Sequence, residues 1–511
     1  MKRHIGLILT CVIFLSAVTI PYLAASSQSG TGYHFLGFLF NPIDGNSYLA
    51  KMQQGWQGQW RFTLPYTAEA GDGAYLFLFY ILLGHISRLF HLPIIVTFHI
   101  ARILSSVAML AALWAWLKIL FADRPCWAQR ALTLIVLGSG LGWLAALWGG
   151  FTPDFWVAEA YPFLSAYANP HFPLGLAILF WVLTDIERTQ DQLPWIVLFL
   201  LGCALSVILQ FGLVILAVIW SALTLWRLLE THQLAWRRPL AFFSGGAFLL
   251  LYQFYAIRSD PILSGWDAQN LTPAPSVLNL LLGLLPAFLF ALMGIRTAWT
   301  ERNLPGRRQL ILWLPLAVIL IYFPFNLQRR FMLGLFVPIG ALAVLGCAAL
   351  PVKRSLARVL MTALTVLSLF TNLIIVWGGL SAARQHNPAL FINANEADAL
   401  EWLSQNASSG DIVLASPEIG LLIPAHSNLR VLYGHPFETL NASLEEQDIY
   451  NFYAGQMNLE QAQSYLSEHH VAWVYWGPHE KALGSSAFLN TLSVAYLNPM
   501  VTIYQIVDTM P

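Results

Sequence analysis

Apolar residues fall in long blocks as far as about residue 380, and beyond that point apolar and polar residues alternate over short stretches. Each block approaches the roughly 17–25 residues that an α-helix needs to cross the hydrocarbon core of a bilayer. The blocks predict about eleven membrane-spanning helices, at residues 5–24, 94–117, 131–149, 171–184, 194–209, 211–226, 239–257, 277–295, 309–325, 331–350 and 357–379. The shorter apolar segment 75–91 contains His85 and Arg88, and it predicts an interfacial or re-entrant helix.

The C-terminal pattern differs from that of the spans. Short apolar runs predict strands at 410–415, 430–433, 471–476 and 501–507, and helical periodicity predicts helices at 396–404, 444–455 and 459–469. This alternation is typical of a small α/β domain. We therefore expect an α-helical polytopic membrane domain over 1–380, with a first outer loop at 25–93, and a soluble α/β domain over 381–511.

Composition agrees with a membrane protein. Of 511 residues, 57% are hydrophobic and 10% are charged, compared with about 25% charged residues in soluble domains. The 26 basic and 26 acidic residues balance, so no net field favours a nucleic-acid partner. The four cysteines lack CxxC or Cys/His spacing and indicate neither a disulfide framework nor a metal site.

Charge predicts the orientation of the spans. The basic start Met1-Lys2-Arg3-His4 precedes an apolar run that we interpret as an uncleaved first span, with the N-terminus in the cytoplasm. The positive-inside rule also favours two spans over 194–226, turning at Gln210-Phe211-Gly212. An odd number of spans then places the C-terminal domain outside the cytoplasm. The cytoplasmic ends would carry Lys118, Arg124, Arg130, Arg188, Arg227, Arg237, Arg238, Arg296, Arg302, Arg307, Arg308, Lys353, Arg354 and Arg358.

Acidic residues in the outer loops are the candidates for catalysis. Asp44 follows the first span, and it would share a helical face with Tyr48 if that stretch is helical. Glu69 lies in a glycine-punctuated turn of the same loop, and the second outer loop contains Glu159 and His171. A carboxylate and a histidine near one interface could deprotonate an acceptor or bind a divalent metal. Alternatively, these acids have no catalytic role, because acidic loop residues often only face solvent and glycine and aspartate are common in ordinary turns.

Basic and aromatic residues on the outer side are candidates for substrate binding. Arg329 and Arg330 lie where positive charge is scarce, and their guanidinium groups suit a phosphate or diphosphate. They could instead anchor helix ends by snorkelling to lipid phosphates. His99 and Arg102 lie one turn apart in the second span, where ionisable groups usually face a protein interior or a wet cavity. Trp266 could stack on a sugar or belong to the interfacial belt.

Two polar residues of the C-terminal domain follow a predicted strand. His435 and Glu438 lie in Gly434-His435-Pro436-Phe437-Glu438-Thr439, where α/β folds place binding loops. GxSxG, P-loop and dinucleotide motifs are absent from the sequence. We interpret this domain as an acceptor-binding element or a lid, with a purely structural cap as the alternative.

The layout of the whole chain resembles the GT-C glycosyltransferases, which include the protein O-mannosyltransferases and the aminoarabinose transferases of lipid A. It is most similar to bacterial members with an Asp-x-x-x-Tyr-Leu segment, here Asp44 to Leu49, and a Tyr-Gly-His-Pro-x-Glu-Thr segment, here Tyr433 to Thr439. The resemblance implies a multi-pass enzyme of the bacterial plasma membrane. Its donor would be a sugar on polyprenyl phosphate, and its acceptor an extracytoplasmic glycan, lipid or protein.

The resemblance also implies roles for individual residues. Asp44 matches the first-loop acid that serves as general base or orients the acceptor, whereas Glu159 and His171 match only by loop. Such enzymes often need a divalent metal, but the contiguous pair of acids that is common in better-known members is absent here. The residues alone leave two other functional classes possible. One is a transporter or flippase, which would place acids deep in the spans, and the other is a non-catalytic envelope protein.

Overall fold

The computed structural model describes residues 2–30, 32–188 and 190–506, and the chain forms two compact units. Unit 1 comprises Met1–Leu23, His99–Leu251 and Leu271–Ser381. Unit 2 comprises Ala24–Phe98, Tyr252–Asn270 and Ala382–Pro511. The first loop and the segment 252–270 therefore group with the C-terminal segment, which the sequence alone does not predict. Each unit is described by itself.

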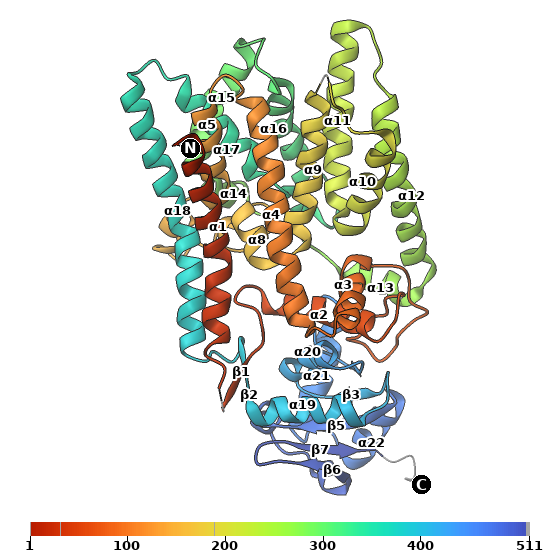
Figure 1. Ribbon diagram of the computed structural model, residues 1–511. Coiled ribbons are helices and arrows are strands. Elements are labelled where there is room, and N and C mark those ends of the chain that lie inside the picture. The colour runs from red at the N-terminus through yellow and green to blue at the C-terminus, as the bar shows by residue number, and fades with distance from the viewer. Residues whose placement is uncertain (1, 31, 189, 507–511) are drawn as a thin grey trace. The chain divides into compact units, whose positions relative to one another are not determined.

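Unit 1 is helical, and its long helices run along a common direction in Figure 1. Within the described ranges, six helices are long and apolar enough to cross a membrane, or seven if one bent pair forms a single span. The chain is thus a multi-pass membrane protein. Its helices are α1 (Lys2–Ser26), α4 (Ile94–Leu120), α5 (Pro125–Leu137), α6 (Gly142–Ala146), α7 (Pro153–Trp156), α8 (Pro162–Ala168), α9 (His171–Glu187), α10 (Trp195–Ile208), α11 (Gln210–Thr231), α12 (Arg237–Ser259), α14 (Val277–Leu284), α15 (Ala287–Thr300), α16 (Arg307–Ile321), the 3₁₀ helix η1 (Gln328–Met332), α17 (Phe336–Ala348) and α18 (Arg354–Arg384).

Most predicted spans coincide with a helix. The span predicted at 94–117 is α4, and the one at 357–379 lies within α18. The predicted division of 194–226 into two helices is confirmed, because α10 ends at Ile208 and α11 begins at Gln210. The break lies at Leu209, however, and the predicted turn residues Gln210-Phe211-Gly212 form the first turn of α11. Some of these helices are shorter than a bilayer requires, so the total of about eleven spans stays a prediction.

Two predicted spans are not single helices. The segment 131–149 is divided between α5 and α6, because Gly138-Ser139-Gly140 interrupts it and glycine is a poor helix former. The segment 277–295 is divided between α14 and α15, which are bent by 83°. Pro286 lies at this break, where its missing N–H and its steric effect on the preceding residue disfavour a continuous helix.

The first loop folds into helices that belong to unit 2. These are α2 (Pro42–Trp56) and α3 (Leu78–Leu89), and α13 (Pro261–Gln269) belongs to the same unit. The helix predicted within 75–91 is thus confirmed. Glycines allow α2 and α3 to approach closely: a Cβ atom on Gly55 would lie 2.1 Å from the Ile81 carbonyl oxygen, and one on Gly84 would lie 2.0 Å from that of Met52.

The C-terminal segment contains the predicted small sheet. Its five strands are in the order β4-β3-β5-β7-β6. The pairs β3–β4 and β3–β5 are parallel, and β5–β7 and β6–β7 are antiparallel. The elements of this segment are β2 (Phe391–Asn393), α19 (Ala394–Asn406), β3 (Ile412–Leu414), α20 (Pro417–His426), β4 (Arg430–Val431), α21 (Ala442–Tyr453), α22 (Leu459–Glu468), β5 (Val471–Trp476), α23 (Pro478–Leu483), η2 (Ala487–Thr491), β6 (Ser493–Leu497) and β7 (Thr502–Gln505).

Most strands and helices of this domain follow the sequence pattern. β5 has the predicted bounds, and β7 lies within the strand predicted at 501–507, whose last residue, Val507, lies outside the described residues. The sequence analysis did not predict β2, β6, α20, α23 and η2. A further antiparallel pair joins β1 (Tyr33–Phe35), in the first loop, to β2.

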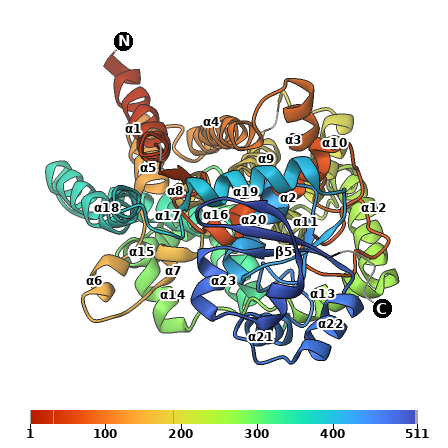
Figure 2. The ribbon, with the colours of Figure 1, turned by 90° about the horizontal axis from the view of Figure 1, so that it is seen from below.

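Both faces of the sheet are covered by helices. Val413 and Ile503 face one core, together with residues of α19 and α20, whereas Leu414 and Val474 face the other, together with residues of α21 and α22. This alternation is the expected consequence of the strand period of two, and Figure 2 shows α19 and α21 on opposite sides of β5. Ala50 of α2 belongs to the first core. The first loop therefore helps to form the hydrophobic core of the C-terminal domain, which explains why both belong to unit 2.

Candidate functional site

The first turn of α2 positions Asp44. Asn41 precedes the helix in a left-handed conformation, with φ 46°, and Pro42 occupies the first helical position. Both choices suit a helix start, because asparagine tolerates this conformation and proline presets φ. A carboxylate in a first turn is also favoured by the helix dipole. The structure confirms that Asp44 and Tyr48 belong to one helix, at the (i, i+4) spacing that was predicted.

Asn41 and His435 both contact the Asp44 carboxylate. Asn41 Nδ2 donates a hydrogen bond to Oδ2, and His435 Nε2 lies 3.4 Å from Oδ1. His435 Nδ1 accepts a hydrogen bond from the Phe437 backbone N–H, at 3.2 Å. In the neutral ring this acceptor leaves the proton on Nε2, where it faces Asp44. The His435 side chain is 3% exposed and that of Asp44 is 34% exposed, so the histidine is fixed by packing while the carboxylate stays accessible.

A buried ion pair lies further along the same helix. Lys51 Nζ lies 2.7 Å from Glu438 Oε1, and Ser47 Oγ donates to the same oxygen at 2.6 Å. The Lys51 side chain has no exposed surface, and its ammonium also lies over the Phe77 ring, 4.6 Å from the centroid. We call Asn41, Asp44, Ser47, Lys51, His435 and Glu438 the Asp44 cluster. It ties α2 to the loop that follows β4.

The charge on Glu438 is stabilised within this cluster. Burial by itself raises the pKa of the Glu438 carboxyl. The charge of Lys51 and the hydrogen bonds from Lys51 and Ser47 outweigh burial, so the pKa is lowered below its ordinary value. Glu438 is therefore the anionic partner of a buried lysine, and substrate binding by His435 and Glu438 stays a prediction.

Ser47 and Lys51 were missed by the sequence analysis, although their spacing contained a signal. Asp44, Ser47 and Lys51 are three and four residues apart, so they lie along one face of α2. His435 and Glu438 have the matching three-residue spacing. Such spacing shows which residues share a face within one helix, but it does not show which residues of the two segments pair.

Of the remaining candidates of unit 2, Tyr48 contacts this cluster, because the Lys51 ammonium lies over its ring, 5.6 Å from the centroid. Glu69 is exposed, and its catalytic role stays a prediction. The Tyr48 ring stacks on that of Tyr80, with centroids 4.3 Å apart and planes at 9°. The Trp266 ring forms a T-shaped contact with that of Phe77, with centroids 5.9 Å apart and planes at 65°.

Unit 1 contains a second cluster, in which two arginines share one carboxylate. Glu159 Oε1 lies 3.4 Å from Arg329 Nε and 3.6 Å from Arg330 Nη1. The Arg329 guanidinium also lies over the Trp156 ring, 5.1 Å from its centroid. The Glu159 side chain is 5% exposed, whereas the arginines are 23% and 28% exposed. This Arg329 cluster places two guanidinium groups around one carboxylate, and both arginines are partly accessible to an anion.

Three further candidates lie in unit 1. His171 begins α9 and is buried, with its ring centroid 4.0 Å from that of Phe172. Arg102 is 1% exposed, donates to the Val18 and Ala166 carbonyl oxygens at 2.8 Å and contacts His99 Nδ1 at 3.2 Å. The Arg102 guanidinium thus stabilises the packing of α1, α4 and α8. Substrate binding by His99, Arg102 and His171 stays a prediction.

Metal dependence stays a prediction, because the described residues form no cluster of three metal ligands. Throughout the described ranges, no group of three or more His, Cys, Asp and Glu side chains could hold a metal ion. Asp44 lies beside a histidine and an amide, and Glu159 faces two cations. The chemistry proposed below therefore uses the residues of the chain itself.

The structure is similar to solved structures of glycosyltransferases. One is the oligosaccharyltransferase of Archaeoglobus fulgidus in complex with zinc and sulfate, with a TM-score of 0.59 and 11% identity, covering 98% of this chain and 73% of that chain. A second is ArnT from Cupriavidus metallidurans bound to undecaprenyl phosphate, with a TM-score of 0.51 and 12% identity, covering 98% of each chain. A third is the arabinofuranosyltransferase AftD from Mycobacteria, with a TM-score of 0.53 and 14% identity, covering 96% of this chain and 40% of that chain.

These similarities extend along nearly the whole chain and confirm the fold that the resemblance to GT-C glycosyltransferases predicted. The sequence matches no family model, and no curated protein matches it. At such low identities the similarity concerns the fold, and the activity has to be argued from the site.

Proposed function

We propose that this protein is a membrane glycosyltransferase that transfers a sugar from a polyprenyl-phosphate carrier to an acceptor outside the cytoplasm. The observation that carries the proposal is the geometry of Asp44, an accessible carboxylate held between Asn41 and His435 at the start of α2. The three glycosyltransferases that share the fold support the same class of activity.

Asp44 has the properties of a general base. In an inverting transfer, the base takes the proton of the acceptor group as its heteroatom forms a bond to the anomeric carbon. The bond from that carbon to the phosphate oxygen breaks, and the electron pair leaves with the polyprenyl phosphate. The contacts from Asn41 and His435 fix the orientation of the carboxylate. A carboxylate oxygen has two lone pairs. It can therefore take the proton of the sugar acceptor with one of them and keep its contact with Asn41 or His435 through the other.

Arg329 and Arg330 have the properties of a phosphate-binding pair. The leaving phosphate gains negative charge as the sugar departs, and preorganised cations stabilise such a charge. Guanidinium groups offer a planar fork of donors for this purpose. We propose that an anionic donor competes with Glu159 for these donors, while the Glu159 carboxylate keeps both side chains in place in the absence of substrate.

His435 acts through Asp44 and is a positioning residue in this proposal. Its Nε2–H orients the carboxylate, and its own orientation is set by the Phe437 N–H. The Lys51–Glu438 pair fixes the loop that carries His435 relative to α2. The shape of the Asp44 site is therefore set by contacts between residues of unit 2.

The cellular orientation is also a proposal. The positive-inside pattern places the N-terminus in the cytoplasm, and about eleven spans would place the C-terminal domain outside it. A bacterial plasma membrane suits this arrangement, and the carrier would be a polyprenyl phosphate like the undecaprenyl phosphate bound to ArnT.

The test is a transfer assay with the purified full-length protein in proteoliposomes. A panel of polyprenyl-phosphate sugars is supplied, and release of polyprenyl monophosphate is measured with a set of glycan, lipid and peptide acceptors. Acceptor-dependent release from at least one donor supports the proposal. A transporter would instead move the intact donor across the bilayer without cleaving it, and that result would refute sugar transfer.

A further inference from the structure

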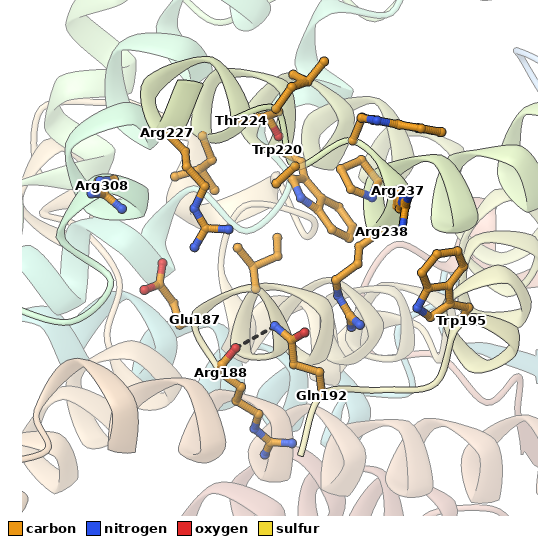
Figure 3. Close-up of a pocket in the computed structure, with 16 residues that line it drawn as sticks. Glu187, Arg188, Gln192, Trp195, Trp220, Thr224, Arg227, Arg237, Arg238 and Arg308 are labelled. Carbon is orange, nitrogen blue, oxygen red and sulfur yellow. Dashed lines mark hydrogen bonds between the residues drawn. The ribbon is translucent and has the colours of Figure 1, made fainter. Parts of the chain in front are cut away.

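Unit 1 contains a cavity that the proposed sugar transfer does not use. Its volume is about 560 Å³, and it is lined by residues from the end of α9, the start of α10, the end of α11, the start of α12 and the start of α16 (Figure 3). Ligand pockets typically have volumes of about 300–1,000 Å³. The cavity is therefore large enough for the polar part of a lipid or for a small soluble anion.

The cavity is strongly basic. Its lining includes one carboxylate, Glu187, and five arginines, namely Arg188, Arg227, Arg237, Arg238 and Arg308. Two nearby carboxylates form ion pairs with part of this set: Asp185 with Arg238, and Glu230 with Arg307 and Arg308. With these neighbours included, six arginines lie near three carboxylates, so the site has an excess of positive charge.

Two of the arginines are available to a ligand. Among the residues that the structure describes, no carboxylate lies within ion-pair distance of Arg227 or Arg237, and both side chains are exposed. Figure 3 shows the Arg227 guanidinium extending from α11 toward the side of the cavity where Glu187 lies, whereas the Arg188 side chain points away from this group. Arg227 and Arg237 are thus the residues whose charge a bound anion would neutralise.

Exposed apolar side chains belong to the same lining. Trp195 is 53% exposed, Leu234 is 56% exposed and Trp236 is 50% exposed. Tryptophan is enriched where a bilayer meets water, because its ring is apolar and its N–H is polar. Arginines beside exposed tryptophans at the ends of apolar helices match the chemistry of a phospholipid, which joins an anionic phosphate to acyl chains.

The positive-inside rule explains why arginines occur at these helix ends, but it does not require them to share one cavity. Arg227 and Arg237 belong to two helices, and Arg308 comes from a third that is distant in sequence. Other arginines expected on the same face, such as Arg354 and Arg358, lie on α18 and do not line this cavity. The positive-inside rule accounts for the side of the membrane on which these arginines lie. It does not account for three helices that place their arginines in one cavity, and this arrangement favours a binding site.

We propose that this cavity binds the phosphate group of an anionic membrane phospholipid, with Arg227 and Arg237 as the principal donors and Trp195, Leu234 and Trp236 beside the glycerol and the first acyl carbons. A phosphate accepts hydrogen bonds from guanidinium groups in a bidentate geometry. A zwitterionic lipid would bind less well, because its choline group adds a positive charge to a basic site.

The test measures lipid binding by native mass spectrometry of the full-length protein in detergent. The probes are dioleoyl phosphatidylglycerol, dioleoyl phosphatidylcholine, inorganic phosphate and glycerol 1-phosphate. The test variant is Arg227→Gln with Arg237→Gln, and the matched control is Arg354→Gln with Arg358→Gln, which also removes two exposed arginines. The protein should bind phosphatidylglycerol more tightly than phosphatidylcholine, and the test variant should bind phosphatidylglycerol about 30-fold more weakly.

The control variant should stay within about threefold of the unmodified protein, since its arginines lie outside the cavity. Equal losses in both variants, or no loss in either, would overturn the proposal, because the arginines would then act only as general surface charge or not at all. Displacement of phosphatidylglycerol by an equal concentration of inorganic phosphate or glycerol 1-phosphate would also overturn it, by identifying a soluble anion as the ligand. Melting curves of both variants check that each is folded.

Discussion

Replacing Glu438 with glutamine should loosen α2 from the C-terminal domain, because it leaves the Lys51 ammonium buried without its anionic partner. The two groups lie 2.7 Å apart, and the Lys51 side chain has no exposed surface. Removing one member of a buried ion pair typically costs about 3–5 kcal/mol, since the remaining charge loses its compensation. At about 1.36 kcal/mol for each factor of ten, the opening equilibrium of α2 should rise by a factor of roughly 150 to 5,000.

Hydrogen exchange with mass spectrometry measures this opening directly. Amides of α2 should exchange faster in Glu438→Gln by that factor, whereas amides of α22, on the other face of the sheet, should change little. Asp398→Asn is the matched control, because Asp398 is an exposed acid of the same domain. The double variant Lys51→Met with Glu438→Leu should recover much of the protection, since an apolar pair can replace a buried ion pair.

Acid should reproduce the effect in the unmodified protein. The folded-state pKa of Glu438 is lowered by Lys51 and the hydrogen bonds despite burial. Its contribution to stability is therefore complete above the unfolded value of about 4.3 and is lost as the pH falls through the lower folded value. Protection of α2 should decrease over that range in the unmodified protein and change less in Glu438→Gln. Equal exchange of α2 in Glu438→Gln and Asp398→Asn would refute the reasoning.

Three further predictions concern the transfer reaction. His435→Phe keeps a ring of similar size but removes the Nε2–H beside Asp44. It should lower kcat about tenfold or more with little change in the KM for the donor, because the carboxylate loses a contact that orients it; an unchanged kcat would show that the histidine only packs. Arg329→Ala with Arg330→Ala should raise the KM for the donor more than that for the acceptor, and equal effects on both would indicate a structural anchor. Transfer should persist in excess EDTA, since the described donors form no metal cluster; loss of activity that is restored by a divalent cation would contradict this.

The sequence predicted the helices of unit 1 well because a bilayer imposes one requirement on each of them, a long apolar block. It failed where the block contains a local interruption. Gly138-Ser139-Gly140 ends α5, and Pro286 separates α14 from α15, yet both segments are apolar enough to resemble one span. A hydropathy value is averaged over many residues, so it does not detect such a break. The backbone conformation, by contrast, depends on the individual glycine or proline.

The candidate site was predictable in part. Asp44 and His435 were both candidates, but nothing in the sequence indicated that their side chains, which lie far apart along the chain, contact each other. Lys51 was missed because a single lysine in an amphipathic helix usually lies in solvent, and its burial depends on Glu438, which lies 387 residues away. Contacts of this kind depend on the tertiary fold, which local periodicity does not encode.

Sugar transfer by the Asp44→Asn variant tests the central claim most directly. Asparagine keeps the size of the side chain and its contact with Asn41, but it cannot take a proton from an acceptor. Asp72→Asn is the control, because Asp72 is an exposed acid in the same loop. Assayed in proteoliposomes with a polyprenyl-phosphate sugar, Asp44→Asn should be inserted and folded but should lose at least about 10²-fold in kcat, whereas Asp72→Asn should retain activity. Full transfer by Asp44→Asn would contradict the assignment of Asp44 as the general base.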